Sequence, residues 1–102
     1  MLEMRPNCEC CDKDLPPDAT DAMICTYECT FCTQCVHELL LNVCPNCGGG
    51  LTPRPIRPKT ERRQGVSLEH QPASTKRIKT QYSEAELRAF GEEWQHVQPE
   101  HR

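Results

Sequence analysis

The sequence predicts a small α+β module that zinc stabilises, followed by a disordered basic linker and one C-terminal helix. Three observations lead to this fold class. Nine of the 102 residues are cysteine, and eight of these form four pairs with two or three residues between the partners. Only 36% of the residues are hydrophobic and 5% aromatic, so an apolar core would be thin and would need a covalent or metal staple. Charge divides the chain into three blocks. Residues 1–51 carry two basic and eight acidic residues, and residues 52–82 carry eight basic and two acidic ones. Residues 83–102 carry two basic and five acidic residues.

The four cysteine pairs predict two metal sites. Two thiols at this spacing can place both sulfur atoms on one zinc ion about 2.3 Å away, and four sulfurs complete the tetrahedron of a structural site. Eight thiols therefore indicate two Zn²⁺ ions, with no position left for a catalytic water. The ligands that this pattern predicts are Cys8, Cys11, Cys25, Cys29, Cys32, Cys35, Cys44 and Cys47. The spacing leaves open whether the pairs serve the two ions in sequence or in an interleaved order.

Buried free thiols, disulfides and iron are the alternatives to zinc. The first residues contain no apolar run of signal-peptide length, and no segment approaches the roughly 18 apolar residues of a membrane span. We therefore expect a cytoplasmic protein, in a reducing compartment where thiols bind metal rather than pair. Residues 44–48 also resemble a rubredoxin knuckle, but such an iron site would use only four of the thiols.

Within residues 1–51 the pattern predicts a hairpin and one helix. Residues 22–24 favour a strand that leads into the second cysteine pair, and residues 27–31 favour a second strand. Because side chains three apart on a strand point to opposite faces, Cys29 and Cys32 would face different ions. Residues 36–43 carry valine and leucine at helical spacing, which predicts a helix that covers the zinc sites from one side.

Two further residues lie near the predicted ligands. Cys10 falls outside the repeated pair spacing and is either a spare thiol beside a metal site or a competitor of Cys8 and Cys11. His37 follows Cys35 closely and is either a solvated helix residue or an additional ligand.

Residues 52–82 are predicted to form a disordered linker. Three prolines within residues 53–58 favour an extended start, and the basic residues fall in two groups. Such stretches can contact phosphate backbones, although no aromatic residue lies between positions 53 and 81 to stack on bases. The alternative is a solvated linker that stays off the acidic module or folds back on it.

Residues 83–98 predict an amphipathic helix. Ser83 and Glu86 form a capping box at its start, and Gly91 weakens it by about 1 kcal/mol. One apolar stripe contains Leu87, Phe90, Trp94 and Val97. A single helix of about 15 residues is marginal in water, so the stripe needs a partner. That partner is either the zinc module of the same chain or another protein.

The order of the ligands resembles that of the RING finger. The shared pattern is pair, loop, pair, pair, short helix and a final Cys-Pro-x-Cys pair at residues 44–47. The resemblance implies an interleaved cross-brace, in which one zinc is held by Cys8, Cys11, Cys32 and Cys35. The other would be held by Cys25, Cys29, Cys44 and Cys47. Residues 1–57 are also similar to a family of small bacterial cysteine-rich proteins known only as a domain of unknown function, which implies no activity.

Four positions depart from the RING pattern of ubiquitin ligases. Cys29 stands where histidine is usual, which zinc accepts. Cys10 replaces an aliphatic residue, Leu39 a tryptophan and Gly48 a basic residue. The partner groove of those ligases is therefore poorly matched, although Pro45 is present.

These observations predict a non-enzymatic zinc-binding protein that serves as a protein–protein interaction module for an unknown partner. No Ser-His-Asp set, paired carboxylate site or phosphate loop is visible. Two other functions stay open: a nucleic-acid-associated zinc protein that uses residues 52–82, and a RING-like adaptor of the ubiquitin-ligase type. We expect neither a membrane nor a small-molecule substrate as partner.

Overall fold

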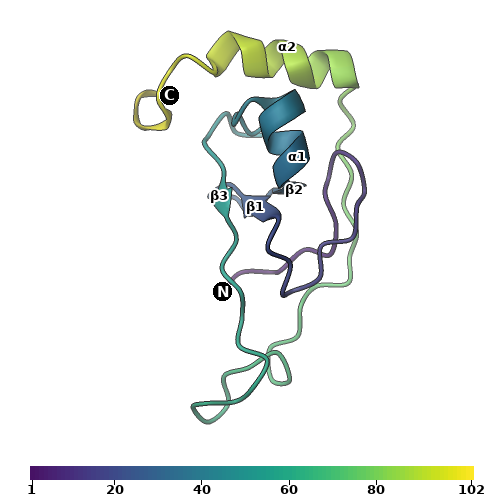
Figure 1. The fold of residues 1–102 in the computed structure, drawn as a ribbon, viewed down its shortest axis with the longest axis vertical. Helices are drawn as coiled ribbons and strands as arrows, with labels where there is room; N and C mark the ends of the chain where they lie inside the picture. Colours follow the sequence, from purple (N-terminus) through teal and green to yellow (C-terminus); the bar gives the residue numbers. More distant parts are fainter.

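The computed structural model describes residues 1–102 and contains a small antiparallel sheet (Figure 1). β1 (Ala22–Ile24) lies between β2 (Thr30–Cys32) and β3 (Thr52–Pro53). Met23 in β1 is opposite Phe31 on one side and opposite Pro53 on the other. β1 and β2 form the hairpin that the sequence predicts. The sequence does not predict β3, because a two-residue edge strand that ends in proline has no pattern of its own.

The hairpin turn explains why β2 begins at Thr30 rather than at Tyr27, where the sequence predicts it. Glu28 has a φ of 68°, a left-handed conformation that interrupts an extended strand. Its amide donates to the Cys25 carbonyl at 3.0 Å, and the Cys25 amide donates to the Cys29 carbonyl at 3.3 Å. The turn therefore brings the two cysteines of the second pair together at one end of the hairpin.

The central helix consists of α1 (Thr33–Cys35) and η1 (Val36–Leu40), the latter a π-helical turn. The amides of Leu41 and Asn42 both donate to the Val36 carbonyl, which is a wider turn than the α-helical pattern. Leu41 and Asn42 have φ values of 55° and 60°, so the helix ends before them. The helix is therefore shifted toward the N-terminus of the predicted range of 36–43, and the left-handed residues direct the chain to the fourth cysteine pair.

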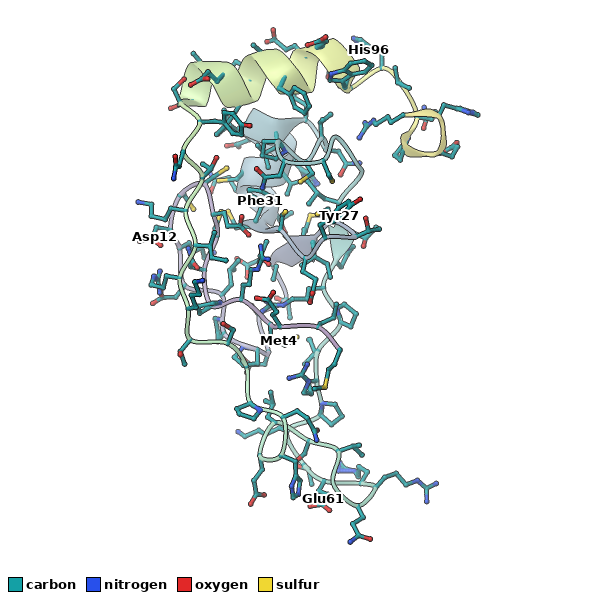
Figure 2. All side chains as sticks on the ribbon, turned by 180° about the vertical axis from the view of Figure 1, so that it is seen from behind. Met4, Asp12, Tyr27, Phe31, Glu61 and His96 are labelled. Carbon is teal, nitrogen blue, oxygen red and sulfur yellow. The ribbon has the colours of Figure 1, made fainter.

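The interior is shared between apolar side chains and sulfur. The largest fully buried apolar side chains are Phe31, Leu15, Leu40, Val36 and Val43. The buried core cluster also contains Cys8, Cys25, Cys29, Cys32 and Cys44. Figure 2 shows Phe31 in the same half of the molecule as most of the sulfur atoms and Glu61 at the opposite tip. The core is as thin as the composition predicts, and thiols occupy much of it.

Both ends of residues 52–82 run beside N-terminal residues (Figure 1), and the disorder of this linker stays a prediction. Arg54 is 5% exposed, and its guanidinium donates to the carbonyl oxygens of Arg5, Leu15 and Pro16 at 2.8, 3.3 and 2.9 Å. This one side chain therefore joins the start of the segment to two separate parts of the N-terminal chain.

The end of the same segment pairs with the first cysteine loop. The Asn7 side chain donates to the Ile78 carbonyl at 2.8 Å and accepts from the Ile78 amide at 3.2 Å. Arg77 forms ion pairs with Asp12 at 3.0 Å and Asp14 at 2.7 Å. The acidic first block therefore offers acceptors to a basic side chain of this segment, which composition alone does not reveal.

α2 (Glu84–Trp94) lies across η1, and the chain ends in a 3₁₀ turn, η2 (Pro99–His101) (Figure 1). The capping box has the predicted form: the Glu86 amide donates to Ser83 Oγ at 3.1 Å, and the Ser83 amide donates to Glu86 Oε1 at 3.0 Å. Leu87 is buried in the core cluster. The helix therefore packs on the chain's own module.

Candidate metal centre

The sulfur atoms of Cys8, Cys11, Cys32 and Cys35 lie within 4.8 Å of one another and form the first cluster. The Sγ atoms of Cys11 and Cys32 are 3.8 Å apart. In a tetrahedron with zinc–sulfur bonds of about 2.3 Å, neighbouring sulfurs are about 3.8 Å apart. The first cluster therefore has the donor type and the separation that a tetrahedral thiolate site requires.

The second cluster contains Cys25, Cys44 and Cys47, whose sulfur atoms also lie within 4.8 Å of one another. Cys29 is outside that limit, but the loop of the fourth pair contacts its thiol. Asn46 Nδ2 donates to Cys29 Sγ at 3.3 Å. The second cluster is thus a group of three thiols with the fourth predicted ligand beside it.

The two clusters draw on alternate cysteine pairs. The first and third pairs meet in one cluster, while the second pair contributes Cys25 and the fourth pair both its members to the other. β2 explains the separation, because Cys32 is its last residue and Cys29 precedes its first. The chain therefore crosses from one cluster to the other along this short strand.

The first and fourth pairs are shaped by the same kind of turn. The Asp12 amide donates to the Cys8 carbonyl at 2.9 Å, and the Gly48 amide donates to the Cys44 carbonyl at 2.7 Å. Both donors follow their cysteine by four residues and have positive φ values, 65° and 78°. Each turn folds the chain so that the two cysteines of the pair face the same cluster.

Backbone amides also point at the sulfur atoms. The Tyr27 amide donates to Cys25 Sγ at 3.3 Å, and the Gly49 amide donates to Cys47 Sγ at 3.4 Å. Hydrogen bonds of this kind stabilise a thiolate, which is the form that binds metal.

The thiols of each cluster differ in acidity. A hydrogen bond from the Cys10 thiol, aided by nearby backbone amides, lowers the pKa of Cys8 to about 4 despite its burial. A hydrogen bond from the Cys44 thiol lowers the pKa of Cys29 to about 5. Burial raises the pKa of Cys32 and Cys35. The first cluster, through Cys8, and the second, through its neighbour Cys29, therefore each have one sulfur close by that is readily deprotonated, and a bound cation would favour the thiolate form of the others.

Two residues that the sequence marks as possible extra ligands lie outside both clusters. Cys10 is half-buried beside the first cluster, close enough to lower the pKa of Cys8, and belongs to neither cluster. His37 is exposed on η1 and belongs to neither cluster.

Glu9 and Arg5 form an ion pair beside the first cluster that no sequence pattern predicts. Glu9 is 2% exposed, and its Oε2 accepts from the Thr30 amide at 2.6 Å and from Arg5 Nη1 at 3.0 Å. Burial raises the pKa of Glu9, against the effect of these two donors. The carboxylate joins the first cysteine pair to β2. Because Thr30 follows Glu9 by 21 residues, no local sequence pattern predicts this contact.

Fold and geometry together define a small cysteine-rich α+β module with two thiol clusters that are able to hold metal ions. The chain belongs to a family described as protein of unknown function (DUF1272), whose model matches residues 1–57. None of its helices has the length and apolar character that crossing a membrane requires.

A relative in Rhizobium meliloti (strain 1021), described as an uncharacterized protein, is 58% identical over 78 residues. The match covers 76% of this chain and 86% of the relative. Because 78 aligned residues exceed the 57 of the family match, the similarity continues into the part of the chain beyond Arg57. No solved structure matches the chain.

Proposed function

We propose that this protein binds two structural zinc ions and acts, without catalysis, as a protein–protein interaction module in the cytoplasm. The observation that carries the proposal is the first cluster, in which four thiols from two separate parts of the chain lie within 4.8 Å of one another. A core this thin needs support, and one structural zinc ion can contribute roughly 10–16 kcal/mol to the folding of a small domain. Zinc suits these sites because it favours tetrahedral thiolate coordination and has no redox chemistry.

The arrangement that we propose is the interleaved cross-brace of a RING-like module. It is supported by the grouping of the first with the third pair and of Cys25 with the fourth pair. Cys29 would complete the second site, since Asn46, which lies between the two cysteines of the fourth pair, donates to its Sγ at 3.3 Å. With eight thiols on two ions, neither site keeps an open position for water or substrate, which supports a structural role.

The basic segment favours this function over nucleic-acid binding. Of the eight basic residues in 52–82, Arg54, Arg57 and Arg77 donate to carbonyl or carboxylate groups of the protein itself. Their positive charge is therefore used within the molecule, where it holds the segment to the acidic first block.

Native mass spectrometry of the full chain, purified under reducing conditions, tests the proposal. We expect two zinc ions per chain. One ion per chain, or iron in place of zinc, would overturn the two-site model. Optical absorption separates the metals, because zinc thiolates are colourless in visible light and iron thiolates are not.

Paired substitutions distinguish the interleaved from the sequential use of ligands. In the cross-brace, C11S with C35S damages a single site and leaves one ion, whereas sequential use would lose both. C11S with C25S gives the reverse result, with both sites damaged in the cross-brace and one in the sequential arrangement. Cobalt substitution followed by absorption spectroscopy counts tetrahedral thiolate sites independently of the mass measurement.

A further inference from the structure

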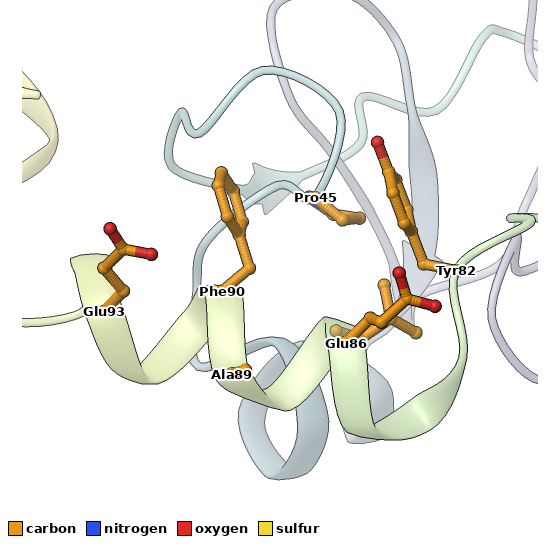
Figure 3. Close-up of a pocket in the computed structure, with 7 residues that line it drawn as sticks. Pro45, Tyr82, Glu86, Ala89, Phe90 and Glu93 are labelled. Carbon is orange, nitrogen blue, oxygen red and sulfur yellow. The ribbon is translucent and has the colours of Figure 1, made fainter.

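An open groove runs between α2 and the fourth cysteine pair. Two hollows of about 350 Å³ each meet at Phe90, which lines both. Figure 3 shows the first hollow, in which the rings of Tyr82 and Phe90 stand on either side of Pro45. The carboxylates of Glu86 and Glu93 lie at its rim.

The groove arises from the way α2 docks. The helix faces η1 through Leu87 and Gly91, both of which are buried. Phe90 and Trp94 are also four residues apart, so they share the neighbouring face of the helix. That face stays open: Trp94 is 39% exposed and Tyr82, just before the helix, is 49% exposed. Three of the five aromatic residues of the chain therefore line a surface that the module itself does not cover.

The charge along this surface is negative. α2 carries four glutamates and one arginine. Glu93 is exposed and has neither a hydrogen bond nor an ion pair, while Glu86 uses Oε1 in the capping box. These carboxylates would repel phosphate groups and anionic lipid, which argues against a nucleic acid or a membrane as the occupant.

We propose that the groove binds an extended, proline-containing basic segment of another protein. This inference rests on the proposed interaction function and names its partner class. Segments in the polyproline conformation bind aromatic-lined grooves with little further loss of conformational entropy. Lysine or arginine beside the prolines would meet Glu86 and Glu93 at the rim and could also stack on the Tyr82 and Phe90 rings.

The second hollow indicates in which direction the bound segment lies along the groove. It is lined by Trp94, Pro99 and Gly49, and by Arg102, whose guanidinium donates to the carbonyls of Val97, Asn42 and Gly48. The carboxylates of the groove lie in the first hollow, so the bound segment carries its basic residues at the Glu93 end and an uncharged proline or aliphatic residue at the Arg102 end. Cys47 of the second cluster lines the same hollow, which connects the groove to the proposed zinc site.

Fluorescence anisotropy with the full, zinc-loaded chain tests the inference. The probe is a fluorescein-labelled peptide with the sequence Pro-Leu-Pro-Pro-Arg-Pro-Lys-Pro. Two control peptides replace its basic residues by glutamate or its prolines by glycine. We expect saturable binding of the probe below ~1 mM, weakened at least about tenfold in either control, and weakened further by salt. Emission from Trp94, the single tryptophan, should change on binding of the unlabelled probe.

Two matched pairs of variants locate the binding. Glu93→Lys should weaken the probe at least about tenfold, while Glu92→Lys, an equal charge change one residue away and outside the groove, should not. Tyr82→Ala should weaken it about fivefold or more, while Tyr27→Ala, at a more exposed tyrosine outside the groove, should not.

The other possible outcomes of these experiments would show that the groove has a different occupant or none. Equal effects of Glu93→Lys and Glu92→Lys, or no saturable binding, would overturn the inference. A dimer in sedimentation analysis that Tyr82→Ala dissociates would mean that a second copy fills the groove, and would also overturn it. Native mass spectrometry on the same samples separates the two proposals: two zinc ions without peptide binding refute only the groove, whereas missing zinc refutes the metal centre.

Discussion

Gly91 of α2 and Leu40 of η1 approach so closely that a Cβ atom on Gly91 would lie 2.5 Å from the Leu40 carbonyl oxygen. Real Cβ atoms do not come this near to a backbone oxygen, so only glycine fits at this crossing. From the sequence, Gly91 is a residue that weakens the helix. In the structure it is the residue that lets the helix reach the module.

Gly91→Ala is therefore expected to release α2, although alanine raises the intrinsic helix propensity by about 1 kcal/mol. Overpacking at such a contact costs about 1–3 kcal/mol, so the free energy of unfolding should fall. Hydrogen exchange of the amides of α2 and η1 measures the loss of docking. Glu92→Ala is the control, because it raises helix propensity at an exposed neighbouring position. If both alanine variants stabilise the protein equally, the close contact does not hold α2.

Cys10→Ala should leave two zinc ions bound, whereas alanine at Cys8, Cys11 or Cys32 should remove one. The reason is that the Cys10 thiol contacts Cys8 but lies outside the first cluster, which has four sulfurs without it. Zinc content by native mass spectrometry measures the difference. Loss of zinc from the Cys10 variant with retention in the Cys8 variant would show that Cys10 is the ligand.

Removal of metal should unfold residues 8–47 as a unit. Each ion accounts for roughly 10–16 kcal/mol, which is as large as the whole net stability of about 5–15 kcal/mol that a domain keeps. A chelator at neutral pH should collapse the amide dispersion in NMR spectra, and zinc should restore it under reducing conditions. Dispersed signals of Leu40 and Val43 in metal-free protein would mean that apolar packing alone holds the core.

Acid should have the same effect as the chelator. A metal-bound thiol is deprotonated, so its pKa in the folded protein lies below the ordinary value of about 8.5. A lowered pKa contributes stability that is complete above the ordinary value and is lost as the pH falls through the lowered one. Zinc release and loss of amide dispersion should therefore coincide during an acid titration. Release of zinc from a chain that stays folded would contradict this linkage.

Arg54→Met should destabilise the module by about 2–4 kcal/mol. The change leaves the carbonyl groups of Arg5, Leu15 and Pro16 without their charged donor in a buried setting. Denaturant unfolding of the zinc-loaded protein measures the loss. Arg62→Met is the matched control at an exposed arginine without a hydrogen bond, and its effect should stay within about 0.5 kcal/mol. Similar values for the two variants would mean that the basic segment does not brace the module.

Local chemistry made several elements predictable from the sequence. The capping box of Ser83 and Glu86 depends only on residues three apart, and the strand at residues 22–24 depends on a short apolar run. The central helix was displaced because Leu41 and Asn42 adopt left-handed conformations, which no residue type at those positions requires. Propensity is a weak guide where tertiary contacts choose the backbone conformation.

By itself the sequence determined the candidate ligands, the thin core and the helix start, because each depends on composition or on residues a few positions apart. Only the tertiary structure decided which cysteine pairs meet, where α2 docks and how residues 52–82 run. Those features depend on groups far apart in the chain, such as Arg54 with Leu15 and Gly91 with Leu40. Such contacts form only when the folded backbone brings both partners together. The spacing of two residues along the sequence does not determine how close they lie in the fold.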